Sequence, residues 1–406
     1  MEIFISIIPL LLDWLDLIIR WIHVIVGIAW IGTSFYFNWL DSRLDRTNNS
    51  YDVEGELWSV HSGGFYNINK LKGPPKKFPK ELHWFKWEAY TTWISGFVLL
   101  IIVYYLNAEG LMIDKNVNDI TPLTAIIISI IFLIGSWFLY DLLCKSKLIK
   151  QTALFTTTCF VISVIVCYFL TKIYGSRAAY IHVGASLGTI MALNVFRVII
   201  PSQKNMVNAA LNNQKPDMAM GISAKTRSIH NNYITLPVLF IMISAHYPFT
   251  YGHKYNWLIL ALISIIGALV RHYFNLRNTK QYKPWILPVA AIGMILLIFY
   301  TALPKIFINQ NNLTSSGEQI SFTEVNNIIK YRCGVCHATK PTFEGFDSPP
   351  LGIIYDNPED ILKNIYKIKS QAIDTDIMPP GNLTGITESE KKKINLWIQQ
   401  GANISN

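Results

Sequence analysis

The first three quarters of the chain alternate between long apolar runs and shorter polar segments. Eight apolar runs are separated in this way: residues 15–40, 84–106, 121–144, 151–171, 178–200, 231–249, 255–275 and 284–303. A helix of about 20 apolar residues is long enough to cross the hydrocarbon core of a bilayer. The pattern therefore predicts an all-α fold that begins with an eight-span transmembrane helical bundle.

Basic residues are concentrated in alternate loops. One set of loops carries most of them: Arg43, Arg46, Lys70, Lys72, Lys76, Lys77, Lys80, Lys145, Lys147, Lys150, Lys204, Lys215, Lys225, Arg227, Arg277, Lys280 and Lys283. The other set carries Lys115, Lys172, Arg177 and Lys254. Because basic loops stay in the cytoplasm, we expect both termini on the opposite side. These loops also account for the formal net charge of +9, so we expect membrane lipid as a partner and no nucleic acid.

The composition changes near residue 309. A polar linker at 309–317 separates a transmembrane domain, residues 1–308, from a smaller domain at 318–406. The smaller domain has the pattern of short helices: one before Cys333, one around 358–371 and one from about Thr387 to Gln400. Thr387, followed three residues later by Glu390, is typical of a capping box at the start of a helix.

The smaller domain contains Cys333-Gly334-Val335-Cys336-His337. C-x-x-C-H is the attachment signature of a c-type haem, in which two thioethers hold the porphyrin and the histidine ligates the iron. Met378 is the candidate for the opposite ligand, and a thioether there raises the reduction potential. The alternative is a surface cysteine pair or half of a zinc site, but no second Cys pair or nearby His completes a zinc set.

We therefore predict a small all-α class I cytochrome c domain with a covalent haem c. Such a haem is normally attached outside the cytoplasmic membrane. This places the domain on the periplasmic side of a bacterial inner (cytoplasmic) membrane, in agreement with the distribution of basic loops.

Two predicted spans share a short motif. Trp21-Ile22-His23-Val24 lies in the first span and Tyr180-Ile181-His182-Val183 in the fifth, which indicates a repeat of four helices in parallel orientation. The repeat would place His23 and His182 at equal depth. Facing histidines in a helical bundle often hold a haem b, and nearby glycines would admit the porphyrin. The alternative is that both histidines bond neighbouring helices and the glycines serve helix packing.

Further ionisable residues lie toward the cytoplasmic side of the predicted spans, where such groups are expensive and often functional. The candidate catalytic residues are Glu88, Arg197, His230, Arg271 and His272. The arginines would bind an anionic substrate through forked hydrogen bonds, or serve only as positive-inside residues. Glu88 would act as a base, or pair with one of the arginines. His230 with His83 or His272 would hold a second membrane haem, or each is an ordinary interfacial histidine.

The chain resembles the membrane-bound urate oxidase (urate hydroxylase) family, in which an eight-span domain is fused to a C-terminal cytochrome c. The resemblance covers nearly the whole chain and rests on these stretches: Trp21 to Asp41, Trp84 to Gly96, His182 to Pro201, His230 to Pro237, Arg271-His272-Tyr273 and Met378 to Gly385. It implies an oxidoreductase of purine catabolism that converts urate and water to 5-hydroxyisourate. Two electrons would leave through the cytochrome c to a further cytochrome or a terminal oxidase, so that no peroxide forms.

Two other functions fit the same pattern. One is a quinol–cytochrome c type electron-transfer protein, which would leave Arg197 and Arg271 unexplained. The other is a transporter with a haem sensor domain. Spectra recorded with and without urate distinguish them, because urate reduces the haem only in a urate oxidase.

Overall fold

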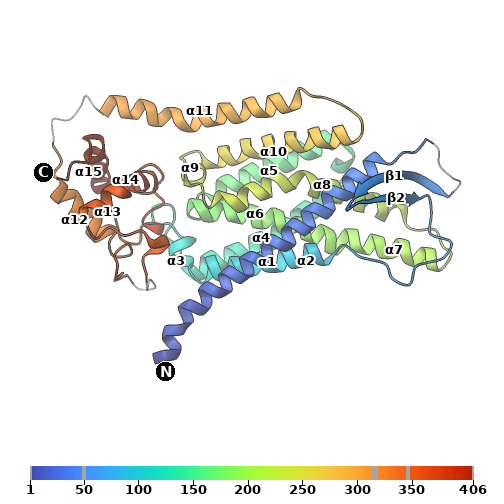
Figure 1. Cartoon of the computed structure of the whole chain (residues 1–406), viewed down its shortest axis with the longest axis horizontal. Coiled ribbons are helices and arrows are strands. Elements are labelled where there is room, and N and C mark those ends of the chain that lie inside the picture. The colour runs from blue at the N-terminus through green and yellow to red at the C-terminus, as the bar shows by residue number, and fades with distance from the viewer. Residues whose placement is uncertain (1, 48–51, 313–318, 344–347, 405–406) are drawn as a thin grey trace.

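The computed structural model describes residues 2–47, 52–312, 319–343 and 348–404. Long helices dominate this part of the chain, and Figure 1 shows them packed side by side in a bundle. They are α1 (Glu2–Arg43), α2 (Trp87–Leu99) with its π-helical continuation η1 (Leu100–Tyr105), α4 (Pro122–Lys145), α5 (Thr152–Leu170), α6 (Ser176–Asn194) continued by η3 (Val195–Ile199) and α7 (Ile200–Leu211), α8 (Met218–Ser244), α10 (Asn256–Asn278) and α11 (Ile286–Asn312). Short helices η2 (Lys147–Lys150), α3 (Ala108–Leu111) and α9 (Pro248–Tyr251) lie in the connections.

Within the described residues, six helices are long and apolar enough to cross a membrane. They are α1 from Leu10, α2 with η1, α4, α5, the continuous helix from α6 to α7, and α10. The apolar part of α11, Ile286–Ala302, is shorter, and α8 does not meet the same criterion. Each of the eight predicted spans therefore overlaps a helix, and six of them have the length and composition of a membrane span.

Helix α8 begins well before the predicted span at residue 231. The side chain of Asp217 accepts hydrogen bonds from the backbone N–H groups of Ala219 and Met220 and so caps the helix. The residues between this cap and the apolar run are polar but compatible with a helix. The prediction was wrong about this start because it followed the apolar run alone, and the difference moves Arg227 from a loop into the bundle.

The loop after α1 forms a β-hairpin, which the all-α prediction missed. Strands β1 (Val53–His61) and β2 (Gly64–Leu71) pair in an antiparallel arrangement. Ser62 and Gly63 form the two-residue turn between them, both with positive φ (48° and 77°) as a type I′ turn requires. The hairpin was missed because it is short and lies between two dominant apolar runs.

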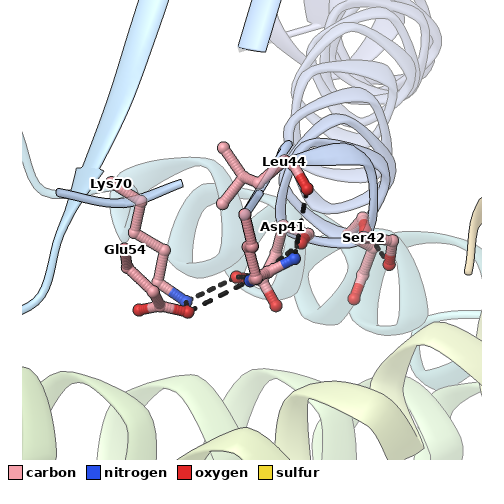
Figure 2. A network of polar contacts seen from close by, with 7 residues as sticks. Asp41, Ser42, Leu44, Glu54 and Lys70 are labelled. Carbon is pink, nitrogen blue, oxygen red and sulfur yellow. Dashed lines mark hydrogen bonds and ion pairs between the residues drawn. The ribbon is translucent and has the colours of Figure 1, made fainter. Parts of the chain in front are cut away.

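Charged residues fasten this hairpin to the end of α1. Lys70 Nζ lies 2.6 Å from Asp41 Oδ1 and 3.2 Å from Glu54 Oε1, and Figure 2 shows the three side chains converging below the helix. Arg46 Nη2 donates to the backbone oxygen of Asp41 at 2.9 Å. Several of the predicted inner-loop basic residues are thus engaged in holding the hairpin in place.

The C-terminal domain is a set of short helices around its own apolar core. The elements are α12 (Phe322–Arg332), η4 (Pro350–Gly352), α13 (Pro358–Lys363), α14 (Ile365–Ile368), η5 (Lys369–Ile373), η6 (Pro380–Asn382) and α15 (Glu388–Gln399). The core includes Val325, Ile329, Ile361, Ile394 and Trp397. The predicted capping box is confirmed, because Thr387 and Glu390 exchange both hydrogen bonds at the start of α15.

Figure 1 places this domain at one end of the bundle, and the hairpin and α7 at the other. Helix α11 returns along the bundle toward the domain and continues to Asn312, beyond the predicted boundary at residue 308. Residues 313–317, most of the predicted linker, lie outside the described part of the chain. The two ends of the described chain therefore lie at the same end of the bundle (Figure 1).

Candidate functional site

Arg271 on α10 is buried against two other helices. Its side chain is 6% exposed, and its Nε donates to Asn232 Oδ1 on α8 at 2.7 Å. Asn275, one turn further along α10, also donates to Asn232 Oδ1, at 2.9 Å. The guanidinium carbon lies 3.6 Å from the centre of the Phe35 ring on α1, which is close cation–π packing. Three helices thus converge on one cation and one aromatic face.

Two donors in this cluster have no partner among the described residues. They are Arg271 Nη2 and Asn232 Nδ2, and the residue that carries the second is 1% exposed. The orientation of the amide is set by its oxygen, which already accepts two hydrogen bonds. A buried donor without a partner costs about 1–3 kcal/mol, and more when it is charged. Two such groups beside an aromatic ring are suited to a planar anion that has carbonyl or ring-nitrogen acceptors.

His272 and Glu88 were predicted to act with the arginines. His272 is half-buried, and its Nδ1 lies 2.7 Å from the hydroxyl of Tyr233 on α8. Glu88 lies in the first turn of α2 with Oε2 buried and unpartnered within the described part of the chain. Its other oxygen is 4.0 Å from His83 Nε2, whose side chain is 70% exposed. The expected ion pair between Glu88 and an arginine is therefore not formed among these residues.

The structure places Arg197 and Arg227 differently from the sequence prediction. Arg197, predicted to bind substrate, is exposed on η3. Arg227, predicted to be a loop residue, is 3% exposed and pairs with Asp141 at 2.6 Å. The spacing of Arg227 and Asn231, four residues apart in a helix, was a signal that would have placed them on one face.

Around Arg227 lies a second polar cluster, and none of its described, fully buried side-chain atoms lacks a hydrogen-bond partner. Arg227 Nη1 donates to Asn194 Oδ1 at 3.1 Å, and Asn194 Nδ2 donates to Asn231 Oδ1 at 2.9 Å. Tyr140 OH lies 2.8 Å from His230 Nδ1 and accepts from Asn194 at 3.2 Å. The His230 ring also stacks on Phe155. This network joins α4, α6 and α8 and is satisfied without a ligand, so it acts as a structural support beside the Arg271 cluster.

The predicted histidine pair of the membrane domain is engaged with serines on other helices. His182 is fully buried, and its ring nitrogens lie 2.8 Å from Ser129 Oγ and 2.7 Å from the Ala178 carbonyl oxygen. His23 Nδ1 lies 3.0 Å from Ser95 Oγ, and its ring packs on Gly96, where a Cβ would lie 3.0 Å from the ring. His182 Nδ1 thus bonds a backbone carbonyl oxygen, as the second nitrogen of a metal-ligating histidine often does, while its Nε2 contacts the Ser129 hydroxyl.

A haem b in the membrane domain stays a prediction. At Gly184 the structure supports the packing alternative, since an added Cβ would lie 2.5 Å from Ile241 Cγ2. The histidines proposed to hold a second haem have different partners. His230 bonds Tyr140, and His272 bonds Tyr233.

The residues of the C-x-x-C-H motif fit a haem c. Cys333 and Cys336 are free thiols at the end of α12. His337 Nδ1 bonds the Ile353 carbonyl oxygen at 3.0 Å, which fixes the ring and leaves Nε2 for an iron. Burial lowers the pKa of His337, and the bond to Ile353 only partly opposes this. The imidazole is therefore neutral at pH 7, as a metal ligand must be.

The segment that carries Met378 is held by its own domain. The backbone N–H groups of Ile377 and Met378 both donate to the Gln371 carbonyl oxygen, at 2.8 and 3.0 Å. Arg332, directly before the motif, donates from Nη1 to the Thr384 carbonyl oxygen at 2.6 Å. This bond ties the segment after Met378 to the end of α12, so the two predicted ligand segments belong to one framework.

Comparison with protein families gave one match over most of the chain. Residues 9–302 match the family described as Urate oxidase N-terminal. Comparisons with curated proteins and with solved structures returned no match. The matched region spans α1 to the apolar part of α11, and so contains the Arg271 cluster but not the C-x-x-C-H motif.

Proposed function

The chain belongs to the urate oxidase N-terminal family, and we propose that it is a membrane-bound urate oxidase that delivers electrons to a haem c in its own C-terminal domain. The family match over 9–302 carries this proposal. It is supported by six helices with the composition of membrane spans and by the C-x-x-C-H framework that follows them.

The proposed reaction is a two-electron oxidation of urate. Urate and one water give 5-hydroxyisourate, two protons and two electrons. When bound, the haem c supplies a one-electron acceptor whose potential a Met ligand raises. The protein's own task in the membrane domain is to bind the anionic purine, orient it and provide groups that take up protons.

We assign urate binding to the Arg271 cluster. Urate is planar and anionic at neutral pH, with carbonyl oxygens along its edges. Arg271 Nη2 and Asn232 Nδ2 would donate to these acceptors, and the Phe35 ring, on which the Arg271 guanidinium packs, holds that cation in place. A ligand that accepts from both donors would remove the cost of leaving them buried and unpaired.

Glu88 and His272 remain the candidate bases of this proposal. Glu88 keeps one carboxylate oxygen buried and without a described partner, and His272 presents Nε2 away from its bond to Tyr233. His230, which was predicted to be catalytic, is instead held by Tyr140 and Phe155. We therefore give it a supporting role next to the site.

The proposed topology has eight spans, with α8 and α11 added to the six helices identified by composition. Both termini would then face the periplasm of a bacterial inner membrane, where haem c is attached. Arg271 lies 15 residues after the start of α10 at Asn256, which is about 22 Å along the helix. Electrons from this site would therefore cross much of the bundle before reaching the C-terminal domain.

The test is anaerobic reduction of the purified, oxidised holoprotein by urate. The reduced c-type bands are expected to appear with urate, and product analysis should detect 5-hydroxyisourate in proportion to one molecule per two electrons. If dithionite reduces the haem but urate does not, the proposal fails. If a quinol does so instead, the protein is of the quinol–cytochrome c class.

A further inference from the structure

The C-terminal domain contacts the membrane domain through the segment that carries Met378. Helix η6 meets α3, and η5 meets α9, at the end of the bundle that faces the domain in Figure 1. A pocket between the two domains is lined on one side by Gly110, Arg177 and Tyr251, and on the other by Ile377 and Met378. The residue predicted to ligate the iron therefore lines the contact itself.

Glycines on the membrane domain let the backbones approach closely. A Cβ on Gly252, directly after α9, would lie 2.5 Å from Thr375 Cβ and 2.9 Å from Ile377 Cδ1. A Cβ on Gly110 in α3 would lie 3.3 Å from Leu383 Cδ1. The contact at Gly252 leaves no room for a side chain while the domain is docked, and at Gly110 even a methyl group would require Leu383 to shift by a few tenths of an ångström.

The partner side has the same property. Gly381 has a φ of +55°, and a Cβ there would lie 2.6 Å from the Ile113 carbonyl oxygen and 3.1 Å from that of Glu109. The loop around it is held from within its own domain, since Thr375 Oγ1 donates to the Ser370 carbonyl oxygen at 2.6 Å and Lys391 Nζ pairs with Asp376 at 2.8 Å. The docking face is thus shaped before it meets the membrane domain.

We propose that this glycine-lined contact is the electron-receiving surface of the C-terminal domain. Docking would hold the segment that carries Met378 against α3, α9 and the loop at Gly175, so that electrons released in the membrane domain would enter the C-terminal domain through this segment. The inference rests on the proposed urate oxidation. One urate loses two electrons and a haem c would accept one at a time, so two transfers across this surface would complete each turnover, with the haem reoxidised between them by the downstream cytochrome or terminal oxidase.

The docked geometry is tested by a distance measurement on the intact holoprotein in detergent. Gadolinium(III) chelate labels, which dithionite does not reduce, are attached to the cysteines of Lys115→Cys, in the loop after α3, and Lys363→Cys, at the end of α13, both at exposed positions. The native thiols at Cys144, Cys159 and Cys167 are replaced by alanine. With the haem reduced by dithionite, and so diamagnetic, a single narrow distance distribution is expected. A broad distribution would overturn the docked arrangement.

Gly252→Val is the variant that should release the domain, because its side chain would meet Thr375 and Ile377. Gly110→Leu repeats the test on a different element, in case the first variant fails to fold. Gly73→Val is the matched control, since nothing lies within 4 Å of its Cβ position and it closely follows β2, which lies at the other end of the bundle. Both docking variants should broaden the distance distribution, and the control should leave it unchanged.

The same variants are then reduced with urate in the absence of oxygen. The rate of haem reduction should fall by about tenfold or more in the docking variants, because the two sites are no longer held together, while dithionite reduces them fully. Undocked variants that urate reduces at the wild-type rate would overturn the electron-receiving role. Failure of urate to reduce the wild-type protein would instead refute the urate oxidation, while the distance measurement still judges the docking.

Discussion

Replacing Arg271 by lysine tests the proposed urate site most directly. Lysine keeps the positive charge but loses the planar fork, and with it the Nε bond of 2.7 Å to Asn232 and the free Nη2 donor. A hydrogen bond to a charged group contributes about 1.5–3 kcal/mol. Since about 1.4 kcal/mol corresponds to a tenfold change in affinity, the Kd for urate should rise by roughly 10- to 150-fold.

The assay is a titration of anaerobic haem reduction with urate, together with equilibrium binding of urate to the dithionite-reduced protein. Arg197→Lys is the matched control. It makes the same chemical change at an exposed arginine, where no buried contacts are lost. Thermal unfolding of Arg271→Lys should show a loss of stability of about 1.5–3 kcal/mol from the charged bond to Asn232. This separates weakened binding from a failure to fold.

The reasoning is refuted if Arg271→Lys binds urate as the wild type does. It is refuted in a more informative way if Arg197→Lys is the variant with weakened binding. The exposed arginine would then be part of the site, as the sequence first predicted.

Three further predictions concern the C-terminal domain and the structural support of the bundle. His337→Ala should abolish the low-spin c-type spectrum, and a normal spectrum in this variant would remove the ligand assignment. Burial opposes ionisation of Glu390, but hydrogen bonds from Thr387 and Arg332 outweigh it and lower its pKa. The stability that Glu390 contributes is therefore present above its unfolded pKa and lost as the pH falls through the lower folded pKa. Unfolding midpoints measured between about pH 3 and 6 should show a weaker pH dependence in Glu390→Gln. An unaltered dependence would contradict this. Arg227→Met should lower the free energy of unfolding by about 3–5 kcal/mol, because it leaves Asp141 buried with Lys145 alone. Replacing Asp141 by leucine as well should recover much of the loss. A double variant no more stable than the single one would argue against the ion pair as the cause.

The helices of this protein could be predicted from the sequence almost completely. Apolar runs marked each long helix, and local signals marked the start of α15, where Thr387 and Glu390 form the expected capping box. Local patterns succeed here because hydrophobic length and capping act within a few residues of chain. They were less useful for the hairpin at 53–71, whose two strands are stabilised by pairing with each other and by the contacts of Lys70 with α1.

The candidate site was predicted only in part. Arg271 and His272 lie where a buried site is formed, but Asn232 and Phe35, which complete it, carry no signal of their own in the sequence. Arg197 was indistinguishable from Arg271 as an arginine near the end of an apolar run. Which of the two is buried depends on the rotation of each helix about its axis, and neighbouring helices set that rotation through packing.

The sequence by itself determined that the chain is a largely helical membrane protein with a C-x-x-C-H motif in a separate C-terminal domain, because these features are written in composition and spacing. The tertiary structure decided which polar groups meet. It placed Arg271 against Asn232 and Phe35, exposed Arg197, and brought the Met378 segment onto the glycines of α3 and α9. These contacts join residues that lie between 39 and more than two hundred positions apart, and only the packing of whole helices and domains brings them within reach.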